Sequence, residues 1–242
     1  MKNLSQLSQF SRYISFLIFQ PISKFILFFL GWSLHIPNLN TDKVIMIFPH
    51  TSNWDFFLML LYVTISYDVS QYAYFLVKPQ PFAYFEKFLY HFNCIAAPKK
   101  ETRNNGFVEI LVNKFKDTSK YYIFLSPKGT RSLNDWRSGY YAIAKNLQIP
   151  IFVIGLDYYL KQLCVYKPQI DLNSSSPEDS HKLFQSYFSK IPQLHPECEN
   201  YIENCDGNCD EKSNKLQLSP IDWFWPISAG IISILIYIAY RN

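Results

Sequence analysis

The 242-residue sequence lacks the glycine-bearing motifs of several large enzyme classes. It has only 7 glycines, and they form no G-x-S-x-G nucleophile elbow, no P-loop and no Rossmann fingerprint. These absences argue against an α/β serine hydrolase and against a nucleotide-binding enzyme. The net charge is only +4, and no dense block of lysine and arginine is present. We therefore expect no nucleic-acid partner, although a mildly basic chain is compatible with an anionic membrane surface or a phosphate-bearing ligand.

Cysteines are also few, with an odd count of 5, and the N-terminus shows no secretory signal with a small-residue cleavage site. We therefore expect a reduced folded part that faces the cytosol. Three cysteines follow His195 with the spacing H-x2-C-x6-C-x3-C, at Cys198, Cys205 and Cys209. Structural zinc sites use paired C-x2-C spacings, so we expect a loose segment here, and metal binding by these four residues stays open.

The C-terminal end carries the longest uncharged run, "WFWPISAGIISILIYIAY" over residues 223–240. At 1.5 Å per residue a helix of this length spans about 27 Å, close to the thickness of the hydrocarbon core of a bilayer. Tryptophan and tyrosine lie towards its two ends, as in the aromatic belts of membrane helices. We predict a transmembrane anchor over 220–242, with a buried core helix as the alternative.

The N-terminal end is apolar but interrupted. Two short pieces, "YISFLIF" and "FILFFLGW", are joined by "QPISK". A lysine at the centre of a spanning helix costs about 2.5–3.5 kcal/mol on insertion scales. We therefore predict a membrane-associated helical hairpin over 1–39. A single kinked span and two pieces that cap the folded core are the alternatives.

Apolar strands and amphipathic helices alternate between these ends. The predicted strands cover 43–48, 72–78, 121–126, 150–159 and 162–168, and the predicted helices cover 55–66, 81–92, 104–117 and 138–147. This alternation predicts an α/β fold with a mostly buried central sheet flanked by helices. We place the folded domain over 40–170 and a polar, acidic tether over 171–219, within which "HKLFQSYFSKI" predicts a short helix.

A histidine and a carboxylate follow the first predicted strand in "HTSNWD", which runs from His50 to Asp55. Ser52 or Asn53 is a suitable N-cap for the next helix, which puts Asp55 in its first turn. Asp55 could then accept a hydrogen bond from one ring nitrogen of His50 and leave the other nitrogen as a general base. Such a dyad would deprotonate a substrate hydroxyl. The alternative is a capping aspartate beside a structural histidine.

A basic turn, "SPKGTRS", follows the predicted strand 121–126. The carboxyl ends of strands in α/β sheets are where ligands bind. Lys128 and Arg131 place two cations there, with the flexible Gly129 and the Thr130 hydroxyl between them. Arginine suits bidentate contact with phosphate, so this turn is a candidate phosphate site. The alternative is a solvated basic turn.

In this order, "HTSNWD", "SPKGTRS" and "NLQIPIFVIGLDY" resemble the conserved blocks of the PlsC-like glycerolipid acyltransferases, the superfamily that contains lysophosphatidic acid acyltransferase. The first block matches the family pattern H-x4-D completely, and the second matches E-G-T-R except at one residue. The resemblance covers about residues 40–170 and implies a glycerol-3-phosphate acyltransferase-like fold.

The resemblance implies that a fatty acyl group passes from acyl-CoA or acyl carrier protein to the free hydroxyl of a lysophospholipid such as 1-acylglycerol 3-phosphate. His50 would be the general base, Asp55 its orienting partner, and Arg131 a ligand of the acceptor's phosphate. Acyl-CoA would be a co-substrate, and neither a metal nor another cofactor is implied. The partners would be the membrane and the two lipid substrates, with an open oligomeric state.

Two positions depart from the family pattern. Lys128 stands where the family has glutamate, and an Ala-Pro-Lys run ending at Lys99 stands where the family tends to have Val-Asp-Arg. Lys99, Lys100 and Arg103 could still contact phosphate, although a lysine lacks the planar fork of arginine. The alternative for these three is a solvated face. The departures keep a second function open, namely a catalytically silent, membrane-bound lipid-binding protein that retains the fold.

Overall fold

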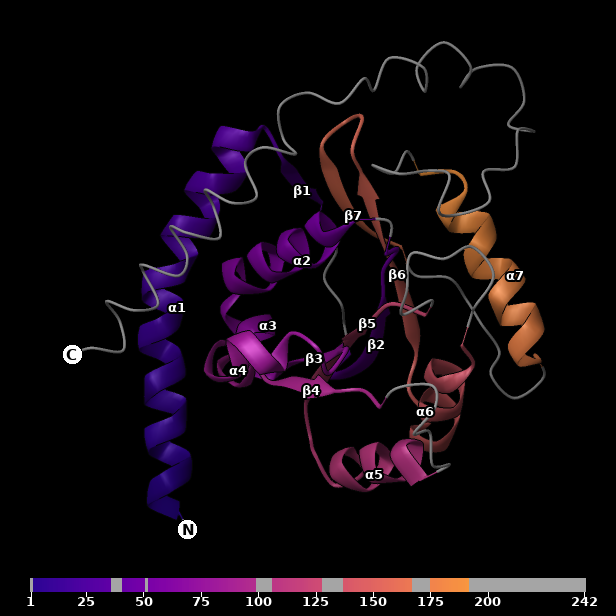
Figure 1. Cartoon of the computed structure of the whole chain (residues 1–242), viewed down its shortest axis with the longest axis horizontal. Coiled ribbons are helices and arrows are strands. Elements are labelled where there is room, and N and C mark those ends of the chain that lie inside the picture. Colours follow the sequence, from indigo (N-terminus) through magenta and orange to yellow (C-terminus); the bar gives the residue numbers. More distant parts are fainter. Residues whose placement is uncertain are drawn as a thin grey trace. The chain divides into compact units, whose positions relative to one another are not determined.

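A seven-stranded sheet forms the centre of the described chain, with the strand order β1-β7-β6-β2-β5-β3-β4 (Figure 1). Neighbouring strands are parallel except for β6 and β7, which pair antiparallel. The strands are β1 (Ser33–His35), β2 (Lys43–Ile47), β3 (Ala73–Val77), β4 (Cys94–Ala96), β5 (Tyr121–Leu125), β6 (Ile151–Asp157) and β7 (Gln162–Tyr166). The computed structural model describes residues 2–35, 41–50, 52–98, 106–127, 137–166 and 175–191.

Strand β2 occupies the middle of the sheet, between β5 and β6. Its residues from Val44 to Ile47 are completely buried, and Ile47 lies opposite Leu125 of β5 and Val153 of β6. Successive side chains of a strand point to opposite faces, so a strand covered on both faces needs a continuous apolar run. The run "VIMIF" satisfies this requirement and fixes β2 as a central strand.

Helices cover both faces of the sheet (Figure 1). They are α1 (Lys2–Leu30), α2 (Asn53–Ile65), α3 (Tyr67–Tyr72), α4 (Phe82–His91), α5 (Gly106–Phe115), α6 (Gly139–Leu147) and α7 (Pro177–Phe188). Helices α1 to α4 contribute to one core cluster, which includes Val44 and Met46 of β2. Helices α5 to α7 contribute to the other, which includes Ile45 and Ile47. The predicted α/β fold with a mostly buried central sheet is confirmed.

All the strands and helices predicted over 43–168 are present, with ends that differ by a few residues. The helix predicted at 181–191 is α7, which begins earlier, at Pro177, because Ser176 and Asp179 form a capping box. Its Phe184 and Phe188 are buried in the core beside α6. The packed part of the chain therefore continues past residue 170, where the prediction ended the folded domain.

The predicted break between two N-terminal apolar pieces is not found within the described residues, because α1 is one helix from Lys2 to Leu30 with Pro21 inside it. Proline cannot donate a helical hydrogen bond, so a break was the local expectation. Contacts with α2 flank the proline: Gln20 Nε2 donates to the Ile65 carbonyl at 3.2 Å, and the Ser23 and Thr64 hydroxyls are 2.7 Å apart. This packing stabilises a continuous helix.

The C-terminus of α1 joins the helix to the edge of the sheet. Gly31 has a φ of 72°, and its N–H donates to the Phe28 carbonyl while the Trp32 N–H donates to the Leu27 carbonyl. This pattern is a Schellman motif, in which glycine takes the left-handed conformation. Lys161 Nζ also donates to the Leu30 carbonyl, at 3.0 Å. The helix end is thus held against the turn between β6 and β7.

Several predicted features lie outside the described residues and stay predictions. They are the anchor over 220–242, the group His195, Cys198, Cys205 and Cys209, and the basic residues Lys99, Lys100, Arg103, Lys128 and Arg131 together with Gly129 and Thr130.

Candidate active site

The motif "HTSNWD" connects β2 to α2 as predicted. His50 is half-buried and follows β2 after two further residues. Ser52 is the N-cap of α2, and its hydroxyl accepts a hydrogen bond from the Trp54 N–H at 3.1 Å. Asp55 completes a capping box, because its Oδ2 accepts a hydrogen bond from the Ser52 N–H at 2.8 Å. The local sequence therefore fixes the carboxylate in the first turn of the helix.

Asp55 is completely buried, with 0% of its surface exposed. Its second oxygen, Oδ1, accepts a hydrogen bond from the Tyr158 hydroxyl at 2.6 Å. A buried carboxylate is costly unless donors surround it, and both donors favour its ionised form. A carboxylate has about four acceptor positions, so two donors leave room for a third. The predicted hydrogen bond from His50 needs that room, and the pairing itself stays a prediction.

Tyr158 is a site residue that the sequence reasoning missed. It follows β6 directly, in the turn that leads to β7, and its ring packs edge-on against Trp32 with the ring centres 5.2 Å apart. Burial and the neighbouring Asp55 carboxylate raise the pKa of Tyr158 well above its ordinary value. The hydroxyl is therefore protonated, and a donor, throughout the neutral pH range. No signal in the sequence pointed to it, because the predicted strand 150–159 enclosed both Tyr158 and the adjacent Tyr159, whereas β6 ends at Asp157.

Three strand ends meet at this edge of the sheet. Strands β2, β5 and β6 are parallel neighbours, so their carboxyl ends lie together. His50 follows β2, Ser126 and Pro127 follow β5, and Tyr158 follows β6. The edge therefore combines a histidine, a buried carboxylate held by donors, and the starting point of the predicted phosphate turn.

The described residues that flank the segment of Lys128 and Arg131 meet near this edge. The backbone N–H of Arg137 donates to the Pro127 carbonyl at 3.1 Å, so residues on both sides of the segment meet. Ser126 Oγ is buried there and has no hydrogen-bond partner among the described residues. The segment that carries Lys99, Lys100 and Arg103 begins after β4, three strands from β2, which is about 14 Å at the usual strand spacing.

No three histidine, cysteine or acidic side chains gather in the described part of the chain in a way that could hold a metal ion. Cys94 is a buried core residue, and burial raises the pKa of its thiol to about 12. The thiol is thus neutral at physiological pH, and Cys94 packs as a core residue.

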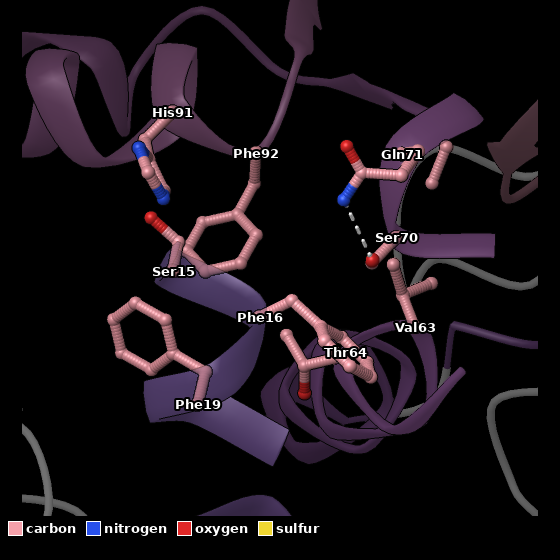
Figure 2. Close-up of a pocket in the computed structure, with 10 residues that line it drawn as sticks. Ser15, Phe16, Phe19, Val63, Thr64, Ser70, Gln71, His91 and Phe92 are labelled. Atoms are coloured by element: carbon pink, nitrogen blue, oxygen red, sulfur yellow. Dashed lines mark hydrogen bonds between the residues drawn. The ribbon is translucent and has the colours of Figure 1, made fainter. Parts of the chain in front are cut away.

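A small crevice lies apart from this site, between α1 and the helices that it covers (Figure 2). Ser15, Phe16 and Phe19 of α1 form one wall, and His91 and Phe92 face them from the end of α4. The rings of Phe19 and Phe92 are 5.8 Å apart, in an edge-on arrangement. None of the lining residues belongs to the β2–α2 turn, so the crevice reflects the packing of α1.

Comparison with known proteins identifies the family. The sequence profile of the family described as Acyltransferase matches residues 34–157, slightly more than half of the chain. A search of curated proteins and a search of solved structures each found no match. The matched region contains the H-x4-D motif and the basic turn that follows β5. It also contains the whole of β6, and it ends at the last residue of that strand. The chain belongs to the acyltransferase family, within the PlsC-like glycerolipid acyltransferase superfamily.

Proposed function

We propose that the protein transfers a fatty acyl group from acyl-CoA or acyl carrier protein to the free hydroxyl of a lysophospholipid, with 1-acylglycerol 3-phosphate as the first candidate. The observation that carries the proposal is the H-x4-D motif at the carboxyl edge of the sheet, with Asp55 buried and held by two donors. A histidine that is oriented by a buried carboxylate can serve as a general base, and the motif places these two residues five positions apart in the sequence.

In the proposed reaction, His50 takes the proton of the acceptor hydroxyl as the oxygen attacks the thioester carbonyl carbon. The tetrahedral intermediate then collapses, the C–S bond breaks, and the thiolate leaves with the proton that the imidazolium returns. Asp55 keeps the imidazole in one tautomer and stabilises its charged form. The protein supplies no nucleophile in this scheme, so no acyl-enzyme intermediate forms.

The acceptor's phosphate is proposed to bind at the turn after β5, through Arg131 and Lys128, with Gly129 and Thr130 beside them. This is supported by the hydrogen bond from the Arg137 N–H to the Pro127 carbonyl, which joins the two described residues on either side of the segment after β5. Lys99, Lys100 and Arg103 are proposed as weaker contacts, because their segment starts three strands away.

The proposed location is a membrane surface, with the catalytic domain facing the cytosol and residues 220–242 as an additional anchor. The stretch Tyr13–Leu30 of α1 is long and apolar enough to cross a membrane. Phe25, Phe28 and Phe29 are 67%, 83% and 75% exposed, whereas the opposite face packs on α2. A helix packed lengthwise on the domain presents this apolar face best to the interfacial plane of a bilayer.

Membrane binding by α1 can be tested with the triple variant Phe25→Ser, Phe28→Ser, Phe29→Ser in a chain truncated after Ser219. Burying each phenylalanine contributes about 1.5–3 kcal/mol, so we expect at least a 10-fold weaker partition into anionic vesicles. The truncated chain without the substitutions is the control. Equal partition of the two chains would contradict a role for this face.

The second candidate is a catalytically silent lipid-binding protein, favoured by Lys128 in place of the family's glutamate. The full chain in detergent, incubated with labelled acyl-CoA and a panel of lysophospholipids, separates the two candidates. We expect acyl transfer to at least one anionic acceptor, and its loss in His50→Ala. Saturable lysolipid binding without transfer to any acceptor would support the silent protein.

A further inference from the structure

The strongest unassigned contact in the site is the hydrogen bond from Tyr158 to Asp55. The two residues are 103 positions apart in the sequence, and their oxygens are 2.6 Å apart. Asp55 Oδ2 is already held by the Ser52 N–H, so the Tyr158 hydroxyl fixes the remaining oxygen. With both oxygens held, the carboxylate plane cannot rotate. Tyr158 also lies just beyond the region matched by the acyltransferase profile, which ends at residue 157.

We propose that Tyr158 is a positioning residue for acyl transfer: its hydroxyl holds the Asp55 carboxylate in one orientation and thereby sets the pH at which His50 becomes a base. This inference rests on the proposed function and extends it to a residue that touches neither substrate. The Trp32 ring, which follows the end of α1, packs against Tyr158, so the position of the tyrosine ring does not depend on Asp55 alone.

Among the described residues, Asp55 is the charged group that acts on the Tyr158 hydroxyl. The segment after α1 contributes Trp32, which does not titrate. In the turn of Tyr158 itself, Asp157 accepts a hydrogen bond from the Leu160 N–H, and Lys161 donates to the Leu30 carbonyl. The β2–α2 turn contributes His50, which follows β2 at the same edge.

The sign of the effect follows from electrostatics. The Tyr158 hydroxyl stabilises the negative charge of Asp55 most when His50 is neutral, because no cation then shares that charge. Without the hydroxyl, more of the carboxylate's charge acts on His50, and protonated imidazole is favoured. His50 would then keep its proton to a higher pH, and the acidic limb of the rate profile would move upward.

The test is Tyr158→Phe in the full chain, with Tyr159→Phe as the matched control, because Tyr159 is the adjacent tyrosine and is 41% exposed. We expect the acidic limb of kcat/KM for lysophosphatidic acid to move up by about 0.5–1 pH unit. This is less than the full free energy of one hydrogen bond to a charged group, because the loss reaches His50 only through Asp55. On that limb the rate would fall about 3-fold to 10-fold and recover at higher pH. The control should retain the wild-type profile.

A second measurement separates failure of this inference from failure of the proposed function. The His50 resonance, assigned by its loss in His50→Ala, is titrated by NMR in the full chain in detergent. Its midpoint should move up in Tyr158→Phe whether or not any acceptor is acylated. Site-specific 3-fluorotyrosine at position 158 keeps the hydroxyl and makes it a stronger donor, so the midpoint should move down. This variant provides the test if Tyr158→Phe does not fold. An unchanged midpoint in a folded variant overturns the inference.

Discussion

The acidic side chains at the two edges of the central sheet have opposite environments: those at one edge are exposed and ion-paired, and that at the other is buried and held by neutral donors. At the amino edge, Lys120 lies 2.8 Å from Asp68 and 3.4 Å from Asp42, and both acidic side chains are more than half exposed. These three charges pair at a surface that water reaches. At the carboxyl edge, the Asp55 carboxylate is buried and held by the neutral donors Ser52 N–H and Tyr158 O–H.

The difference favours the carboxyl edge as the place for the proposed chemistry. An exposed ion pair is screened by solvent and typically contributes less than about 1 kcal/mol. A buried carboxylate held by neutral donors keeps its charge available to a neighbouring imidazole. Environments of this kind are typical of functional sites, and the exposed cluster has the properties of a solvated sheet end.

The largest effect is expected at the carboxyl edge, from His50→Ala. Loss of a general base should lower kcat by about 10²–10⁴-fold, with the thermal unfolding midpoint nearly unchanged because His50 is only half-buried. Steady-state acyl transfer and thermal unfolding would be measured in parallel. His91→Gln is the control, since His91 lies at the end of α4. Retained turnover in His50→Ala would remove the proposed mechanism.

Asp55→Ala should affect both activity and stability, which distinguishes it from His50→Ala. The substitution leaves the Ser52 N–H and the Tyr158 hydroxyl without their acceptor, at a cost of about 1–3 kcal/mol in unfolding free energy. Turnover should fall nearly as far as in His50→Ala. Denaturant unfolding and initial rates measure the two losses. Full activity in a destabilised variant would make Asp55 a capping residue only.

A smaller effect is expected from Lys128→Glu in the basic turn. Reversing this charge should raise KM for lysophosphatidic acid several-fold at low salt. The value of kcat should stay nearly unchanged, because the proposed phosphate contact would be made in both ground and transition states. Lysophosphatidylcholine, whose headgroup carries no net charge, is the control acceptor. A rise in kcat/KM on lysophosphatidic acid would instead indicate that glutamate at position 128 performs the family's function. That outcome would contradict a phosphate contact by Lys128.

The smallest effect is expected at the amino edge, from Lys120→Met. The variant removes both ion pairs with Asp42 and Asp68, yet unfolding free energy should change by less than about 1 kcal/mol. Acyl transfer should stay within twofold of the wild type. A large loss of activity would show that the two edges are coupled and would break the contrast between them.

The parts of the fold that sequence predicted are those with strong local signals. The strand β2 is a continuous apolar run, and Ser52 caps α2 within the same few residues that carry the motif. Elements β1, β4 and α3 were not predicted, because three to six residues are too short to show a period.

Two other misses, the continuity of α1 and the role of Tyr158, have a different physical cause, which is that distant partners decided them. Pro21 predicts a break locally, but Gln20 and Ser23 bind α2, far along the chain, and the helix continues. Likewise, nothing near Tyr158 shows that its hydroxyl, and not that of Tyr159, reaches Asp55. That choice is made when β6 pairs beside β2 and brings the two ends together.

The pairing of β1 with β7 has a consequence for the order in which the protein is built. Ser33 lies opposite Gln162, so α1 and β1 leave the ribosome long before the strand that receives them exists. During that interval β1 has no sheet edge to join. The exposed apolar face of α1 is already complete, so the proposed membrane contact could form before the sheet does. The Trp32–Tyr158 contact forms only after β6 has been made. A nascent chain that stops before β6 therefore carries the whole H-x4-D motif, but its carboxylate has not yet received the second of its donors.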